Sequence, residues 1–324
     1  MLSVSLLKAR TPSIRGLADY LPSPHSKQAK TFKPFIVMKA LFFIASKLSN
    51  SPYVIIDFTS LDGFKVKLFI ASLAVRGRSL PFYCKPLYLR DIHNLRFKSE
   101  NEFIMFSIKE LLSIIPEHLR ERIILLGDRQ FGTKRFLIFF KEEGIRFIVR
   151  VKKNLLVKVR KEVIRCEQLK KGKYMVDIEG EGYFLYVRED GREKLILVSN
   201  FENIDSLKAS RKYLKRSYCE QMHRDLKSRL RLLFLNSKYY KKLDEEKVKK
   251  YLVLFMLAEI VGIWIGKLTK RSKYYSMFCS KEDERSLFHL GQIIISQIYV
   301  FQDIGLRFRI SAMKLFLIGR RCNL

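Results

Sequence analysis

Three carboxylates stand where they could support metal-dependent chemistry. Asp57 lies within the apolar run 53–59. Asp128 directly follows the apolar run 122–127, and Glu220 lies in a segment with helical spacing. A carboxylate in a buried strand is costly unless its charge is compensated, either by a metal ion or by hydrogen bonds to a turn at the strand end. Three converging carboxylates would repel one another, and two divalent cations would remove that repulsion.

The ligand chemistry indicates which cations and which reaction to expect. Oxygen-only ligands select hard ions, so Mg²⁺ or Mn²⁺ fits better than Zn²⁺. Two such ions about 4 Å apart activate a water or a 3′-hydroxyl and stabilise the leaving oxygen of a phosphodiester. The acids therefore predict phosphodiester chemistry if the fold brings them together.

Glu220 stands in a cationic setting. At about 100° of rotation per residue, four residues of the predicted helix fall within an arc of roughly 60°. They are Tyr213, Arg216, Glu220 and Lys227, with Arg224 and Arg231 close to the arc. The opposite side is apolar and is predicted to face inward, and it carries Tyr218, Met222, Leu226 and Leu230. Pairing with acids one turn away does not explain a face with a single acid among cations, so this face predicts a site.

The composition narrows the choice of substrate. The chain has 324 residues, of which 48% are hydrophobic, so it can bury a sizeable core and global disorder is not expected. Lys and Arg number 63 against 32 Asp and Glu, which gives a net charge of +31. Nucleic acid is the first candidate for a partner of such a surface. An anionic membrane surface is the alternative.

The cysteines, the N-terminal segment and the apolar run 251–266 suggest no further catalytic site. The five cysteines form no C-x-x-C pair, which disfavours a structural zinc site and is typical of reduced, intracellular thiols. Residues 1–34 hold four prolines and scattered basic residues, and we expect an irregular arm there. A transit peptide is the alternative for this arm. The apolar run 251–266 is short for a bilayer and contains Glu259, so it predicts a core helix that includes Trp264.

The order of predicted elements suggests how the acids meet. Helical spacing is found at 35–48, 99–116 and 133–143, and strand-like runs at 53–59, 64–75, 80–88, 122–127 and 146–151. The first three strands are predicted to form an antiparallel meander. From the first strand the order is β-β-β-α-β-α-β, which resembles a ribonuclease-H-like fold. In that fold the first and fourth strands are neighbours, which would bring Asp57 beside Asp128.

Short alternating runs between 152 and 204 predict a β-rich insertion ahead of the Glu220 helix. It carries Tyr183, Phe184 and Tyr186 with lysines nearby. Rings among basic residues can stack on nucleotide bases. Ordinary packing of aromatic residues within a sheet is the competing interpretation.

The spacing Tyr213, two residues, Arg216, three residues, Glu220, six residues, Lys227 matches the Y-R-E-K motif. On this motif and the two upstream aspartates, residues 51 to 268 resemble the insertion-sequence-four family of DDE transposases. The resemblance implies that Asp57, Asp128 and Glu220 bind two catalytic Mg²⁺ or Mn²⁺ ions. It also implies that Tyr213, Arg216 and Lys227 hold transposon-end phosphates.

Further expectations follow from the resemblance. They are cut-and-paste transposition of double-stranded DNA, a homodimeric synaptic complex and a cytoplasmic, nucleoid-associated protein. Arg129 and Arg224 are additional candidates for DNA contacts. The resemblance also implies a division of the chain into regions. A short basic N-terminal region, 1–50, precedes a ribonuclease-H-like core at 51–151 and 205–268, which is a mixed five-stranded sheet flanked by helices. The insertion 152–204 interrupts this core, and a helical basic region, 269–324, follows it.

Two features depart from the family pattern. Only 56 residues precede Asp57, where relatives usually carry a larger DNA-binding region. Relatives that form a DNA hairpin use a tryptophan in the insertion, whereas this insertion has none, so Tyr183, Phe184 or Tyr186 would substitute or the step would differ. The alternatives are therefore a catalytically inactive DNA-binding remnant and a stand-alone nuclease of the same fold.

Two residues near Glu220 receive no catalytic role from the sequence. His223 lies at the edge of the cationic face and is interpreted as a surface histidine, with phosphate binding as the alternative. Cys219 is expected to point toward the apolar side of the helix, so it is not a candidate nucleophile.

Overall fold

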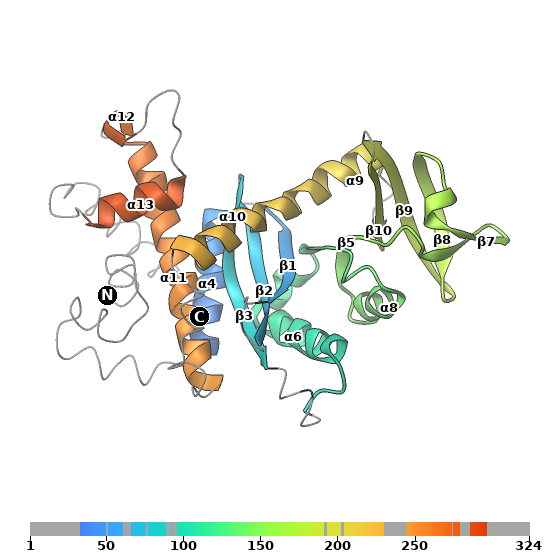
Figure 1. Ribbon diagram of the computed structural model, residues 1–324, viewed down its shortest axis with the longest axis horizontal. Helices are drawn as coiled ribbons and strands as arrows, with labels where there is room; N and C mark the ends of the chain where they lie inside the picture. Colours follow the sequence, from blue (N-terminus) through green and yellow to red (C-terminus); the bar gives the residue numbers. More distant parts are fainter. Residues whose placement is uncertain are drawn as a thin grey trace.

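Ten strands form one sheet in the part of the chain that the structure describes. The computed structural model describes residues 33–49, 51–60, 66–75, 77–88, 92, 96–190, 193–201, 204–229, 245–273, 275–278 and 286–296. The strand order is β3-β2-β1-β4-β5-β10-β9-β8-β6-β7 (Figure 1). The strands are β1 Tyr53–Ser60, β2 Val66–Val75, β3 Arg78–Tyr88, β4 Ile124–Gly127, β5 Arg146–Arg150, β6 Leu156–Val159, β7 Glu162–Arg165, β8 Gly172–Ile178, β9 Glu181–Asp190 and β10 Glu193–Ser199.

Helices fill the intervals between the strands and follow them. They are α4 Pro34–Leu48, α6 Glu100–Ile114, α7 Glu117–Arg120, α8 Lys134–Glu142, α9 Ser206–Tyr213, α10 Tyr218–Arg224, α11 Glu245–Lys270, α12 Tyr275–Phe278 and α13 Leu287–Ser296. Short 3₁₀ turns span Cys166–Gln168 and Leu214–Ser217, and a π-helical turn spans Asp225–Arg229.

The first half of the sheet has the predicted arrangement. Strands β1, β2 and β3 are antiparallel neighbours, as the meander predicted. Strand β4 runs parallel to both β1 and β5. The long apolar runs of these strands are explained by helices on both faces of the sheet, since a strand that is buried on both sides does not alternate between apolar and polar residues. The element order and the adjacency of β1 and β4 are compatible with a ribonuclease-H-like transposase domain.

The sheet continues beyond the five strands predicted for the core. Strand β10 pairs antiparallel with β5 from Leu197 opposite Arg150 to Ser199 opposite Ile148. The strands of the predicted insertion therefore extend the core sheet instead of standing apart from it. Strand β7 lies at the far edge of the sheet.

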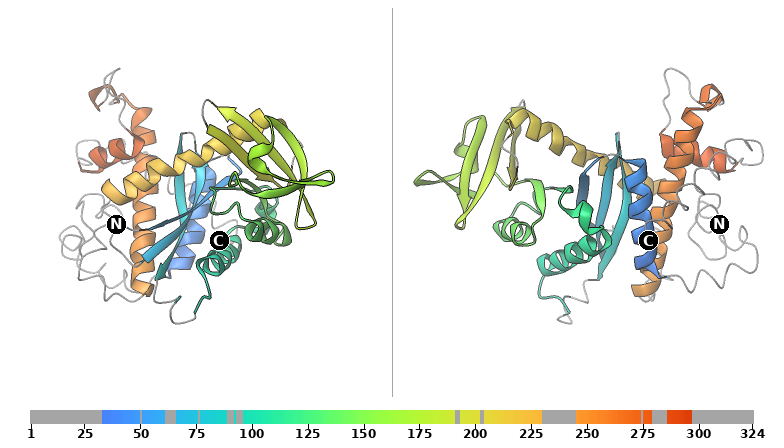
Figure 2. Two further views of the ribbon diagram at one scale, coloured as in Figure 1. Left: turned by 45° about the vertical axis from the view of Figure 1, so that its right-hand side comes forward. Right: turned by 180° about the vertical axis from the view of Figure 1, so that it is seen from behind.

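Helices cover the two faces of the core sheet in separate sets. Phe82 of β3 contacts Phe42 of α4 edge-to-face, with ring centroids 5.0 Å apart. Phe58 of β1 lies 6.1 Å from Phe103 of α6, on the other face. Figure 2 shows α4 and α11 on one side of the sheet and α6 on the other. Asp57 precedes Phe58 in the strand, so it faces the side of α4 and α11.

The segment that carries Glu220 is not one uniform α-helix. It starts as α9, tightens into the 3₁₀ turn Leu214–Ser217, continues as α10 and ends in a π-helical turn. Figure 1 shows it crossing from the insertion to α11 over one end of the core strands. Asp205 caps its start by accepting a hydrogen bond from the Lys208 amide at 2.8 Å.

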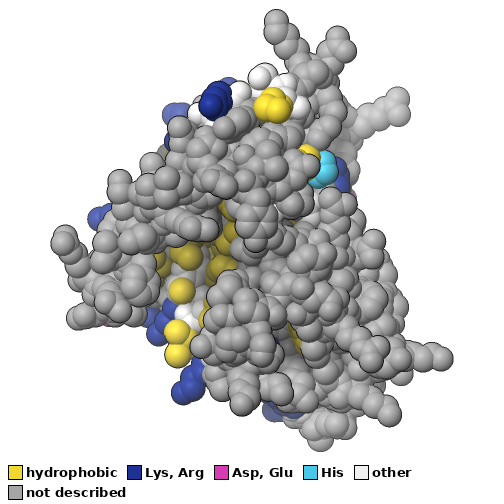
Figure 3. Space-filling view, turned by 90° about the vertical axis from the view of Figure 1, so that its left-hand side faces the viewer, with side chains coloured by type: hydrophobic (Ala, Val, Ile, Leu, Met, Phe, Trp, Pro, Cys, Tyr) yellow, Lys and Arg dark blue, Asp and Glu magenta, His cyan; other side chains and the backbone are white. Residues whose placement is uncertain are grey.

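Helix α11 is the one candidate membrane span among the described residues, but 72% of its most apolar window is buried within the protein. It packs against β3, α4 and α13, and Trp264 is buried, as predicted for a core helix. Glycines allow close contact with α13, since a Cβ on Gly266 would lie 1.8 Å from the carbonyl oxygen of Leu287. Figure 3 views this end of the molecule, and hydrophobic side chains are among the described ones visible there.

Some predictions fall outside the described residues. They concern the N-terminal arm up to residue 32, Leu230, Arg231 and the C-terminal part of the basic region from residue 297.

Candidate active site

Asp57 is a half-buried carboxylate in the middle of β1. Its strand neighbour Ile56 is fully buried, while the Asp57 side chain is 13% exposed. The side chain points to the face on which α10 lies. Such a position keeps an acid charged only where cations compensate it.

Asp128 is held at the end of the strand next to β1. The last parallel pair between β1 and β4 is Ile55 with Leu126, and two residues further along each chain lie Asp57 and Asp128. The Asp128 carboxylate accepts a hydrogen bond from the amide of Gln130 at 2.9 Å, which fixes the side chain in a local turn. The predicted adjacency of the first and fourth strands is thus confirmed.

The loop that follows Asp128 is seated against β5. A Cβ on Gly132 would lie 2.1 Å from the carbonyl oxygen of Arg150, so this position requires glycine for the close approach. Phe131 is fully buried beneath the loop. Gly132 and Phe131 therefore hold the loop that carries Asp128 in a fixed position against β5.

Arg216 lies among all three acids. Its guanidinium is 3.0 Å from an Asp57 oxygen, 3.7 Å from an Asp128 oxygen and 3.8 Å from a Glu220 oxygen. Burial lowers the pKa of Arg216, but the surrounding groups, Asp57 and Asp128 among them, raise it above its ordinary value. One positive charge thus lies near three carboxylates, with a hydrogen bond to Asp57 and longer contacts to Asp128 and to the exposed Glu220.

His223 meets the other oxygen of Asp57. Its Nε2 lies 2.8 Å from Asp57 Oδ2, and its side chain is 15% exposed. The interpretation of His223 as a surface histidine is therefore wrong, because the turn of α10 directs the ring toward β1. Burial raises the pKa of Asp57, but contact with His223 and the charge of Arg216 more than offset this, and the pKa falls below its ordinary 3.8.

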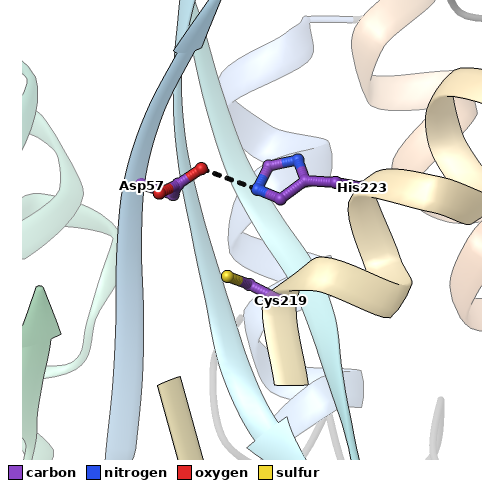
Figure 4. A group of neighbouring side chains, drawn as sticks. All are labelled: Asp57, Cys219 and His223. Carbon is purple, nitrogen blue, oxygen red and sulfur yellow. Dashed lines mark ion pairs between the residues drawn. The ribbon is translucent and has the colours of Figure 1, made fainter. Parts of the chain in front are cut away.

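Cys219 lies beside the same carboxylate. It is buried, as expected for the apolar side of the helix, yet its Sγ, a ring nitrogen of His223 and an Asp57 oxygen all lie within 4.8 Å of one another. Figure 4 shows both α10 side chains directed toward Asp57 on β1. Burial, followed by the charge of Asp57, raises the pKa of the Cys219 thiol to about 12.

The predicted DNA-contacting residues take different positions. Lys227 reaches the end of β1, with Nζ 3.2 Å from Thr59 Oγ1 and 3.4 Å from the Ser60 carbonyl oxygen. Arg129 and Arg224 are exposed. Tyr213 is buried, which corrects the expectation of an exposed face, and burial raises its pKa to about 12.

A buried ionic cluster that the sequence analysis missed anchors the helix. Arg78 of β3 lies 3.0 Å from an Asp225 oxygen and 3.8 Å from a Glu259 oxygen. Both acids are fully buried, and the Gln221 amide donates a hydrogen bond to Asp225 at 3.1 Å. Because it connects β3, the end of α10 and α11, this cluster fixes the helix that carries Arg216, Cys219, Glu220 and His223. An acid on the apolar stripe, as Asp225 is, was the available signal for it.

The insertion offers limited aromatic surface. Tyr183 and Tyr186 are each 1% exposed, so sheet packing explains them and they do not present rings for stacking. Phe184 is half-buried against the core. Met175, its cross-strand partner, is 71% exposed.

The three carboxylates around Arg216 offer only oxygen atoms, which are the donors that hard cations prefer. Among the described residues, the group whose donor atoms all lie within 4.8 Å of one another is instead Asp57, Cys219 and His223, so the oxygens of Asp57, Asp128 and Glu220 do not meet that closely. Asp57 takes part in a second set with a thiol and an imidazole, which suits borderline cations instead.

Comparison with known families decides the general identity. The family model described as "Transposase DDE domain" matches residues 92–256, just over half of the chain. The protein belongs to this family of transposases. No curated protein matches the chain. The matched region of the transposase includes Asp128 and Glu220, and Asp57 lies upstream of it.

Membership of this family indicates the general activity and the kind of cofactor. The family implies an enzyme that acts on DNA, and its members generally use divalent metal ions. This agrees with the prediction of a DDE transposase made from the motif.

Proposed function

We propose that this transposase cuts double-stranded DNA at transposon ends and joins the freed ends to target DNA by a cut-and-paste route. The observation that carries the proposal is the convergence of Asp57, Asp128 and Glu220 around the single guanidinium of Arg216. Asp57 and Asp128 lie far from Arg216 in the sequence, whereas Glu220 lies one helical turn beyond it, so the approach of the two aspartates to this guanidinium is the part that local spacing does not explain. A ribonuclease-H-like core accounts for their positions.

Asp57, Asp128 and Glu220 are the proposed ligands of two Mg²⁺ or Mn²⁺ ions. Such ions supply activation of the attacking oxygen and stabilisation of the leaving oxygen. Because Asp57 is half-buried, water reaches its carboxylate from one side only. Glu220 is exposed, so its side chain can adjust to the substrate.

Arg216 has two proposed roles, one after the other. Without metal it neutralises the three acids. When cations take over that role, its guanidinium can bind a phosphate of the transposon end, as a planar fork with several donors does well. Lys227, at the end of β1, is proposed to hold the next phosphate along the strand.

The remaining cations and the tyrosine complete the proposed interface. Arg129, beside Asp128, and Arg224, one turn beyond Glu220, are exposed and are proposed to contact the DNA backbone. Tyr213 supports the helix from within and is proposed to offer only its hydroxyl edge. Two transposon ends require two active sites, so we propose a homodimer in the synaptic complex.

Strand cleavage tests the proposal. The substrate is a labelled duplex that carries the DNA flanking the coding sequence, with Mg²⁺ or Mn²⁺, and the test compares the native chain with Glu220→Gln. We expect metal-dependent nicking followed by joining, both lost in Glu220→Gln. Glu189→Gln is the matched control, because Glu189 is similarly exposed but lies in the insertion.

Other outcomes decide between the alternatives. Binding without cutting by both the native chain and Glu220→Gln would contradict the catalytic assignment and favour an inactive DNA-binding remnant. Cutting that is never followed by joining would favour a stand-alone nuclease.

A further inference from the structure

Asp57 has two chemically different sides. Its Oδ1 faces Arg216 and, beyond it, the other two acids. Its Oδ2 faces His223 and Cys219 on α10. Because Cys219 and His223 are four residues apart on a helix, both side chains project from the same face toward the strand.

We propose that Asp57, Cys219 and His223 form a second cation site, for a borderline divalent cation such as Zn²⁺. Thiolate, imidazole and carboxylate are the three ligand types that Zn²⁺ takes in proteins. Bond lengths of about 2.0–2.3 Å to these ligands place donor atoms roughly 3.3–3.8 Å apart in a tetrahedral site. The observed donor atoms, all within 4.8 Å of one another, need only small shifts to reach that geometry.

Charge and burial suit such an ion. The site is largely closed to water, with Cys219 1% exposed and the side chains of Asp57 and His223 13% and 15% exposed. One carboxylate and one thiolate balance a dication, so the occupied site carries no net charge into the interior. The fourth position is left open to water, because three protein donors are present.

Binding requires loss of one proton but no redox partner. The Cys219 S–H bond breaks as the sulfur binds the cation, and that proton goes to solvent. His223 binds as the neutral imidazole through its unprotonated ring nitrogen, so it releases no proton, and no oxidation state changes.

Occupation of this site has a consequence that rests on the proposed function. A Zn²⁺ ion that draws Asp57 Oδ2 toward α10 competes with the hard cations for which Asp57 is a proposed ligand. The site would therefore make the enzyme sensitive to Zn²⁺ even when Mg²⁺ is in excess.

Cobalt spectroscopy tests the site without DNA or catalysis. The full chain is titrated with Co²⁺, which gives a near-ultraviolet charge-transfer absorption when a thiolate binds it. We expect this band in the native protein, its displacement by one equivalent of Zn²⁺, and its loss in Cys219→Ser. The matched control Cys166→Ser removes another buried thiol, in the insertion, and should keep the band.

A second variant keeps the test decisive if Cys219→Ser folds poorly. His223→Gln retains the thiol, and we expect the band to remain while the affinity for Co²⁺ falls at least about tenfold. Circular dichroism spectra of each variant check the fold. A native protein without the band, a band that persists in folded Cys219→Ser, or an affinity unchanged in His223→Gln would each overturn the proposal.

Cleavage assays then separate this proposal from the proposed function. In the presence of Mg²⁺, Zn²⁺ should inhibit nicking by the native chain at lower concentrations than it inhibits Cys219→Ser. Equal inhibition of both would reject the competition. If the native chain never cuts DNA, the proposed function fails, while the Co²⁺ band still reports the site.

Discussion

Arg216 is the residue on which the metal-free site depends. It is 22% exposed and contacts three carboxylates. A guanidinium in that place competes with any metal for the same oxygens. DNA phosphates that draw the guanidinium away from the acids should therefore favour metal binding. Through Arg216, the binding of DNA and the binding of the metal ion are then coupled.

Arg216→Ala should bind Mn²⁺ more tightly than the native chain in the absence of DNA. Removing the competing cation should raise the affinity by at least about fivefold, while cleavage is lost with the phosphate contact. Isothermal titration calorimetry measures the affinity, and Arg129→Ala, an exposed arginine beside Asp128, is the control. An affinity that falls in Arg216→Ala would mean that the arginine assembles the acids and does not compete with the metal.

The ion pairs of Asp57 should appear as a pH dependence of stability. Its folded pKa lies below 3.8, so the charged form stabilises the native state above that value. This stabilisation is lost as the pH falls from about 3.8 through the folded pKa. We expect the difference in unfolding free energy between the native chain and Asp57→Asn to be constant near neutrality and to shift against the native chain below about pH 4. Urea unfolding with a chelator present measures it, and a difference independent of pH from 6 to 3 would contradict the assignment.

Different secondary-structure elements position the two aspartates. Asp57 is placed by β1, whereas Asp128 depends on a loop that rests on β5 through Gly132. The two acids therefore differ in sensitivity to small backbone shifts.

Gly132→Ala should impair the site with a limited loss of stability. The new methyl group would collide with the Arg150 carbonyl oxygen, and overpacking of this kind costs about 1–3 kcal/mol. A displaced Asp128 should reduce cleavage by at least about tenfold. Gly182→Ala is the control, because no atom lies within 4 Å of its Cβ position. Equal cleavage by the two variants would show that Gly132 does not set the position of Asp128.

The buried Arg78 cluster anchors α10 to β3 and α11. Arg78→Met leaves Asp225 and Glu259 without the guanidinium, and we expect a loss of about 3–5 kcal/mol in the free energy of unfolding. Lys134→Met removes one partner of an exposed pair with Glu179 and should cost no more than about 1 kcal/mol. Urea unfolding of both variants gives the comparison. Similar losses would mean that the cluster is not a structural anchor.

The whole molecule carries 63 basic residues, and their charge should dominate DNA affinity. Several described Lys and Arg side chains lie on the face that Figure 3 shows. A net charge of +31 attracts DNA of any sequence, while the acids at the proposed centre act locally.

DNA binding should weaken steeply with salt. We expect the logarithm of the association constant to fall with the logarithm of salt concentration with a slope of about −5 or steeper. Lys227→Ala should reduce the slope by about 1, because one phosphate contact is lost. Lys109→Ala removes the same charge on α6, on the other face of the sheet, and should leave the slope unchanged. Fluorescence anisotropy measures both, and equal effects of the two variants would contradict a phosphate contact at Lys227.

The sequence by itself determined the elements and the chemical character of this transposase. Apolar runs placed Asp57 in a strand and Asp128 at a strand end, since burial of both sheet faces demands such runs. The element order indicated that β1 and β4 are neighbours, and the spacing from Tyr213 to Lys227 indicated the family. Net charge indicated nucleic acid as the partner class.

Only the tertiary structure decided the surroundings of each side chain. A helical wheel assumes uniform rotation, but a 3₁₀ turn before Glu220 and a π-helical turn after it change the rotation along the segment. The wheel therefore placed Tyr213 on the exposed face, although it is buried. Contacts such as Arg216 with the acids, His223 with Asp57 and Arg78 with Asp225 join residues distant in sequence. Local pattern cannot determine them, because they depend on which segments pack together and on which charges burial forces to pair.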